Sequence, residues 1–161
     1  PVSAMDAKIR QRLGEGLDGI QNGLGITVIF VDHDQEEAMA VAHRIGVMNK
    51  GKFDQVGTPD EIYDHPQTLH VASFIGEMNF IDKKDYTIAV RPEDLEVTKE
   101  EGDMTATVST VMLMGHYVLM TAHVGDKIVK CYVNRDIGDT LEEGEVVNLK
   151  IGKHTQFPLS A

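Results

Sequence analysis

The spacing of hydrophobic and polar residues changes near residue 80 and divides the chain into two parts. Before that point, segments with helical spacing alternate with short apolar runs; after it, apolar residues recur mostly at every second position. The first pattern is typical of an α/β arrangement and the second of an all-β one. We therefore predict an α/β piece over residues 1–78, followed by a small β domain over residues 79–161.

The first part combines one buried strand with several helices. Ile26–Val31 is apolar without polar alternation, which is typical of a strand buried on both faces of a parallel sheet. Helices are predicted from Asp6 onward, where apolar residues recur every three or four positions, and from Gln35 to about Ala42. A capping box at Thr58–Glu61 starts a third helix, and a fourth runs from about Gln67 to Ile75.

One segment nearly matches a phosphate-binding loop. Gly46–Phe53 fits G-x-x-x-x-G-K-[ST] except at its last position, where Phe53 has no hydroxyl to offer Mg²⁺. The apolar residues on both sides are typical of strands, and Asn49–Lys52 is a turn signal. We predict a β-hairpin here, and no other stretch of the 161 residues matches the motif.

The second part contains short strands separated by glycine-containing turns, a pattern that favours a small barrel or sandwich. The predicted strands are Thr87–Val90, Ala106–Val111, Tyr117–Ala122, Ile128–Val133 and Val146–Ile151.

Composition narrows the classes of function. The net charge of −11 argues against a general nucleic-acid binder, and no apolar stretch is long enough to cross a membrane. The single cysteine, Cys131, fits a reducing compartment and is predicted to be packed in a strand. The methionine-rich segment Val111–Gly115 is predicted to fill a core or an interface rather than to form a cofactor site. The histidines lack metal-ligand spacing, so no metal site is expected.

His33 is the first candidate for chemistry. It follows the predicted strand between Asp32 and Asp34, at the edge where α/β sheets bind ligands. A histidine taken alone is more often a surface or packing residue, so His33 needs support from its surroundings.

That support comes from the order of motifs along the chain. Ser3-Ala4-Met5-Asp6, a helical segment, an apolar strand and then His33-Asp34-Gln35-Glu36-Glu37-Ala38 closely resemble the ATPase subunit of ABC transporters. Further stretches that resemble this family are Arg44–Lys52, Gly57–Tyr63 and Val71–Gly76. Val90–Asp94 resembles part of the TOBE or OB-type β domain that importers of this family carry.

The resemblance implies a fold and residue roles. The chain would be the C-terminal remnant of a P-loop ATPase core followed by a small OB-like barrel. Ser3 and Asp6 would belong to the D-loop, which faces the partner subunit across the nucleotide. His33 would be the switch histidine that contacts the γ-phosphate and the attacking water. Asp34 and Gln35 would seat that loop.

The resemblance also implies partners and a location. The whole protein would use ATP and Mg²⁺, pair as a homodimer, and act on transmembrane permease subunits at the inner face of the cell membrane. In the family, the phosphate loop, the signature sequence and the catalytic glutamate precede the position of Pro1. We therefore expect the chain alone to be inactive as an ATPase.

The alternative is a freestanding β module that binds a small ligand or an oxyanion. Its most plausible anion contacts are Arg91, Lys127, Lys130 and Arg135. The sequence leaves this alternative open.

Overall fold

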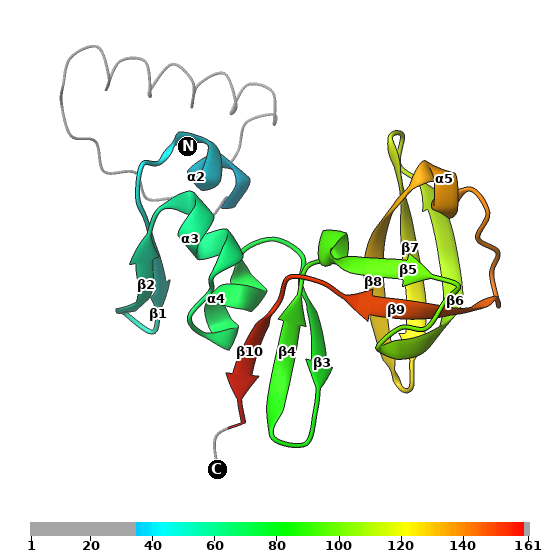
Figure 1. Ribbon diagram of the computed structural model, residues 1–161. Helices are drawn as coiled ribbons and strands as arrows, with labels where there is room; N and C mark the ends of the chain where they lie inside the picture. Colours follow the sequence, from blue (N-terminus) through cyan, green and yellow to red (C-terminus); the bar gives the residue numbers. More distant parts are fainter. Residues whose placement is uncertain (1–34, 160–161) are drawn as a thin grey trace. The chain divides into compact units, whose positions relative to one another are not determined.

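A computed structural model describes residues 35–159, and the chain divides into two compact units, residues 1–76 and residues 77–161. Figure 1 shows the elements of both units along the chain. The predicted strand Ile26–Val31 and the helix predicted from Asp6 lie outside the described residues.

The first unit is a hairpin packed against short helices. Its described elements are α2 (Gln35–Val41), β1 (Ile45–Asn49), β2 (Lys52–Gly57), α3 (Pro59–Asp64) and α4 (Leu69–Phe74). Its core contains Ile45, Val47, Ile62, Val71 and Ile75, which come from one face of the hairpin and from the inner sides of α3 and α4. Residues far apart in the sequence thus share one small apolar cluster.

Polar side chains fix the ends of the helices in this unit. The predicted capping box is present: Thr58 Oγ1 accepts a hydrogen bond from Glu61 N, and Glu61 Oε2 accepts one from Thr58 N. At α4 there is a single such bond, in which Thr68 Oγ1 accepts from Val71 N at 3.1 Å. Gly76, with φ of 66°, follows the end of α4 in the left-handed region that suits glycine.

The second unit is built from two antiparallel sheets. One has the strand order β10-β4-β3, formed by Thr155–Pro158, Tyr86–Val90 and Asn79–Asp82. The other has the order β5-β9-β6-β7-β8. Its strands are β5 (Leu95–Thr98), β9 (Val146–Ile151), β6 (Met104–Leu113), β7 (Tyr117–Val124) and β8 (Lys127–Asn134). Short helices, η2 (Pro92–Asp94) and α5 (Arg135–Gly138), precede β5 and follow β8.

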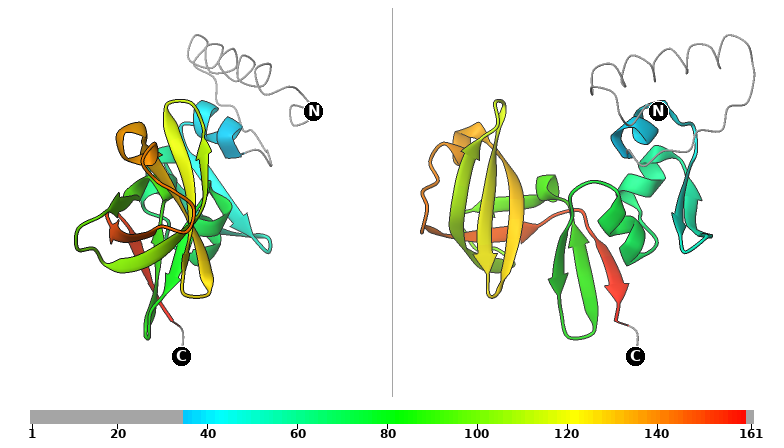
Figure 2. Two further views of the ribbon diagram at one scale, coloured as in Figure 1. Left: turned by 90° about the vertical axis from the view of Figure 1, so that its right-hand side faces the viewer. Right: turned by 180° about the vertical axis from the view of Figure 1, so that it is seen from behind.

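The five-stranded sheet curls on itself. Its two edge strands, β5 and β8, approach each other without forming a ladder, so the sheet encloses a core as part of a barrel (Figure 2). Buried residues of both sheets join in one apolar cluster, which includes Ile81, Ile88, Val108, Met120 and Leu149. This unit is therefore an all-β structure with a single core.

The five strands predicted in this part are all present. Three short strands, β3, β5 and β10, were not predicted from the sequence. Each has only four residues, too few to show a clear period of two. They exist because longer strands supply their partners: β4 pairs with both β3 and β10, and β9 pairs with β5.

Leu149 offers a direct test of this core. It is completely buried on β9, between β5 and β6, and we expect Leu149→Ala to lower the free energy of unfolding by about 2–5 kcal/mol. Val146 on the same strand is exposed, so Val146→Ala should change it by about 0.5 kcal/mol or less. Urea unfolding of both variants measures the difference, and equal losses would contradict the assigned core.

Candidate functional site

Most of the residues predicted to act at a nucleotide lie outside the described part of the chain. This applies to Ser3, Asp6, His33 and Asp34. Gln35 is the first residue of α2, so the helix predicted to follow the switch loop begins where the sequence placed it. The roles of these five residues stay predictions.

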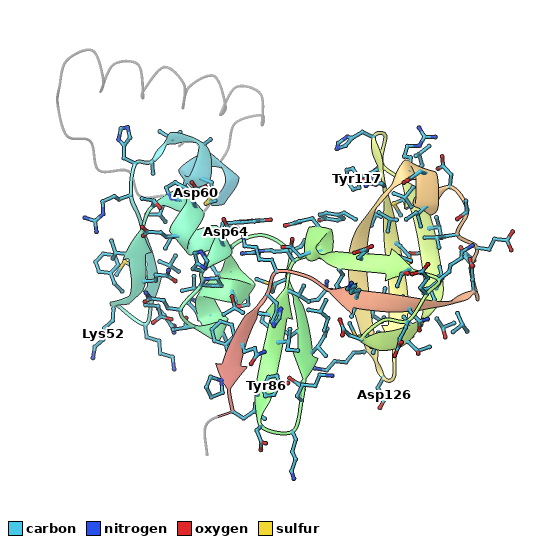
Figure 3. The ribbon with its side chains drawn as sticks, viewed as in Figure 1. Lys52, Asp60, Asp64, Tyr86, Tyr117 and Asp126 are labelled. Carbon is cyan, nitrogen blue, oxygen red and sulfur yellow. The ribbon has the colours of Figure 1, made fainter. Side chains whose placement is uncertain are left out.

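The segment that resembles a phosphate loop is a hairpin, as predicted. β1 and β2 pair from Ile45↔Gly57 to Asn49↔Lys52, which leaves Lys50 and Gly51 as the turn. Both turn residues have positive φ, 51° and 77°, as a tight turn between twisted antiparallel strands requires. Lys52 lies beside this turn at the exposed end of the hairpin (Figure 3). The segment therefore offers no cradle of backbone N–H groups preceding a helix.

The link between α3 and α4 is held by a buried amide. Gln55 Nε2 donates to His65 O at 3.0 Å, and its Oε1 accepts from Gln67 N at 2.8 Å. Next to it, Asp54 Oδ2 accepts from Thr68 Oγ1 at 3.1 Å, which steadies the cap of α4. The sequence did not reveal this arrangement, because Gln55 and Asp54 look like ordinary polar residues of a strand.

Each of the four cations suggested for an oxyanion site already has a partner within the protein. Arg91 is buried and its Nη1 donates to Glu77 O at 3.0 Å. The other three have carboxylate partners: Lys127 with Asp82, Lys130 with Glu77, and Arg135 with Asp139. Hydrogen bonds, first from Lys127 and then from Thr87, hold the pKa of Asp82 below its usual value. Asp82, the partner of Lys127, therefore stays charged. This arrangement does not favour an oxyanion site.

A shallow hollow of about 290 Å³ lies between β5 and α5. Val97, Ile137 and Leu141 give it an apolar lining, and Glu96, Glu100 and Asp136 add carboxylates. Lys99, which also lines it, is paired with Glu145 at 3.6 Å. Carboxylates repel oxyanions, so this hollow gives the oxyanion alternative no support either.

Of the methionine-rich segment predicted to fill a core or an interface, Val111 packs against the core as a partly buried residue. Met112, Leu113 and Met114 are 53%, 59% and 45% exposed. They lie where β6 ends and the chain turns into β7, beyond the residues that face the core, so strand alternation no longer buries them. The remaining prediction for them, an interface, is not tested by the structure.

Three ring-bearing side chains, His116, Tyr117 and Tyr132, lie in contact next to this turn. The ring centroids of His116 and Tyr117 lie 4.8 Å apart in an edge-on arrangement, and those of Tyr117 and Tyr132 on β8 lie 5.1 Å apart. Burial raises the pKa of Tyr132, and the charge of Glu77 raises it further, so this hydroxyl stays protonated. The rings close one end of the β7–β8 ladder.

Across residues 35–159, no group of three or more histidine, cysteine, aspartate or glutamate side chains is placed to hold a metal ion. Over the same residues, no helix is long and apolar enough to cross a membrane.

Comparison with known proteins shows which family this chain resembles. Residues 88–155 match the TOBE domain family. Three proteins named "Spermidine/putrescine import ATP-binding protein PotA" match more of the chain. The one from Bacillus thuringiensis (strain Al Hakam) is 50% identical over 101 residues, or 63% of this chain and 31% of its own length. The one from Borreliella afzelii is 39% identical over 77% of this chain and 43% of its own length.

The third, from Mesorhizobium japonicum, is 34% identical over 94% of this chain and 51% of its own length. The chain belongs to the family of ATP-binding proteins of ABC importers, and it matches their C-terminal, TOBE-containing region. The resemblance read from the sequence is therefore confirmed. The matches span between about a third and a half of these curated relatives.

Cys131 is a packed thiol, as predicted. It is completely buried in the core of the TOBE unit, and burial raises its pKa from 9.0 to about 12. The native state then holds the thiol proton more tightly than the unfolded chain does. This contribution to stability is present below about pH 9 and is lost as the pH rises toward about 12.

We expect the free energy of unfolding to fall over this pH range, and the fall to be smaller in Cys131→Ala. Urea unfolding at several pH values gives the slope of the free energy of unfolding against pH for each protein. Comparing slopes removes the constant loss of stability caused by the cavity that the sulfur leaves. Identical slopes in the two proteins would contradict the assignment.

Proposed function

We propose that this chain forms the C-terminal part of the ATP-binding subunit of an ABC importer, which couples ATP hydrolysis to solute uptake. The observation that carries the proposal is 34% identity to such a protein over 94% of the chain. The names of the relatives point to spermidine or putrescine as the class of solute. The chain's own sequence carries no feature that selects the solute.

In this proposal, residues 1–78 are the end of a P-loop ATPase core and residues 79–161 an OB-like TOBE domain. Ser3 and Asp6 lie at the interface with the second ATPase subunit, where the nucleotide is bound. His33 orients the water that attacks the γ-phosphate, and Asp34 and Gln35 hold its loop. An imidazole suits this role because it can both accept and donate a proton near neutral pH.

The described residues do not themselves fit ATP or Mg²⁺. Where the sequence comes nearest to a phosphate loop, the structure has a hairpin, and no described cluster is placed to hold a metal ion. ATP and Mg²⁺ therefore belong to the full-length protein in this proposal. The 161 residues alone should not hydrolyse ATP, because the groups that position and neutralise the phosphates are not among them.

The outer face of the β1–β2 hairpin supports a larger ATPase core. Met48, Phe53 and Val56 are 56%, 64% and 45% exposed on this face, opposite the residues that pack on α3 and α4. We infer that the remainder of the core covers them. Permease subunits then hold the assembly, as a homodimer, at the cytoplasmic face of the cell membrane.

A chimera tests the function directly. The ATP-binding region of the Bacillus relative, up to the start of its match, would be joined to this chain. We expect the chimera to hydrolyse ATP and His33→Ala to reduce the rate at least a hundredfold, while the 161 residues alone stay at background. Phosphate release measures the rate of ATP hydrolysis by the chimera, by its His33→Ala variant and by the 161 residues alone.

His154→Ala in the same chimera is the matched control, since His154 is an exposed histidine of the TOBE unit and should leave the rate unchanged. A folded, active chimera that tolerates His33→Ala would refute the role of His33. Turnover by the 161 residues alone, lost in His33→Ala, would refute the inactive state proposed for them.

We also expect the chain to form a dimer or a larger oligomer, since the uncovered apolar face of the hairpin and the exposed segment Met112–Met114 both favour association. Light scattering over a range of concentrations measures the average mass. A monomer at the highest concentration would be the contrary result.

A further inference from the structure

The turn between β6 and β7 carries three side chains of the kinds that bind soft metal ions (Figure 1). They are Met112, Met114 and His116, and all three are exposed. The clusters ruled out above consist of histidine, cysteine and carboxylate side chains, whereas the thioether of methionine is a ligand for a different class of ion. This turn therefore has to be considered separately as a metal site.

The register of the β6–β7 hairpin places both methionines on its outer face. Met112 lies opposite Leu119, and Leu119 precedes the fully buried Met120, so Met112 points away from the core. Met114 N donates to Tyr117 O at 2.9 Å, which extends the ladder by one pair beyond the end of β6. Met114 follows Met112 by two positions, so the two thioethers are neighbours on one exposed face.

The turn brings an imidazole to the same place. The chain reverses over Gly115 and His116, and Gly115 has a φ of 107°, a conformation that favours glycine. The ring of His116 contacts that of Tyr117, the residue directly across the hairpin from Met114. The side chain of His116 is exposed, so its ring nitrogens can be reached from solvent. The imidazole is therefore held beside the residue that faces Met114.

Two thioethers and an imidazole are a ligand set for copper in its reduced state. Thioether sulfur is soft and uncharged, so it favours Cu⁺ and is a poor ligand for Mg²⁺ or Ca²⁺, which prefer oxygen. Imidazole nitrogen also binds copper. The methionine side chain is unbranched and turns about three bonds, so two of them on one face can close on a single ion.

We propose that Met112, Met114 and His116 form a site for one cuprous ion, with the two Sδ atoms and one ring nitrogen as its ligands. The thiol of Cys131, another soft group of this unit, is completely buried in the core and takes no part. The site does not rest on the function proposed above, because none of its residues is placed at the nucleotide. Its test measures binding of the ion, and not ATP hydrolysis.

The test is a competition for Cu⁺ between the untagged 161-residue chain and bicinchoninate, a chelator that is coloured when it holds Cu⁺, in the presence of ascorbate and without oxygen. We expect the chain to withdraw Cu⁺ from the chelator. Met112→Leu, Met114→Leu and His116→Asn should each lower the affinity about tenfold or more, since even residues that only support metal ligands contribute that much. Leucine keeps the apolar side chain and removes the sulfur.

Three variants are matched controls and should keep the wild-type affinity. Met48→Leu removes an exposed methionine of the β1–β2 hairpin, and His154→Asn removes an exposed histidine of the TOBE unit. Cys131→Ala removes the buried thiol. Circular dichroism of every variant shows whether it is folded.

A measurement on the wild type identifies the ligands without any substitution. Ag⁺ has the same charge and softness as Cu⁺ and is not oxidised in air. In NMR spectra it should shift the ring resonances of His116 and the methyl resonances of Met112 and Met114, and leave the ring of His154 unchanged.

The proposal is overturned if the wild type withdraws no Cu⁺ from bicinchoninate, or if Met112→Leu and Met114→Leu together leave the affinity unchanged. It is also overturned if Met48→Leu or Cys131→Ala, although folded, abolishes binding, or if Ag⁺ leaves the resonances of His116 and both methionines in place.

Discussion

The TOBE unit depends on the burial of one apolar cluster between two sheets that share no ladder. Ile81 and Ile88 enter this cluster from the three-stranded sheet, whereas Val108, Met120 and Leu149 enter it from the five-stranded sheet. Neither sheet alone can cover its own inner face, because a sheet with one apolar face must bury that face against another element. The curl of the larger sheet and the position of the smaller one both follow from this shared burial.

Polar groups then determine how the edges are closed. Where the two sheets meet, strand pairing is replaced by the amide of Asn79 and by the ion pairs of Lys127 and Lys130. Buried backbone groups must find partners, so such a seam specifies one position of β3 along β8. In the first unit, Gln55 fixes the link between α3 and α4 through its hydrogen bonds with His65 O and Gln67 N. The lysines once considered as anion contacts are thereby occupied with structural carboxylates.

The similarity to ATP-binding proteins of ABC importers helps to interpret two features of the β1–β2 hairpin, its apolar outer face and its near match to a phosphate loop. The chain spans about half the length of one relative. In the function proposed above, the remainder of the ATPase core covers the apolar outer face of the β1–β2 hairpin. The near match to a phosphate loop shows how context decides the meaning of a motif. Strands on both sides of Lys50 and Gly51 turn the segment into a hairpin, and Phe53 lacks the hydroxyl that Mg²⁺ needs.

The sequence by itself determined the long strands, the hairpin, the capping box at Thr58 and the family, because each rests on local spacing or on a run of adjacent residues. The buried state of Cys131 also followed from strand alternation. It could not place β3, β5 and β10, nor show that Met112–Met114 lies past the core, because strand partners and the end of a sheet are set by distant residues. The pairing of Asn79 with Lys130, separated by 51 positions, was decided only by the tertiary structure. A buried amide has no local signature, and only folding brings it to the backbone group that it satisfies.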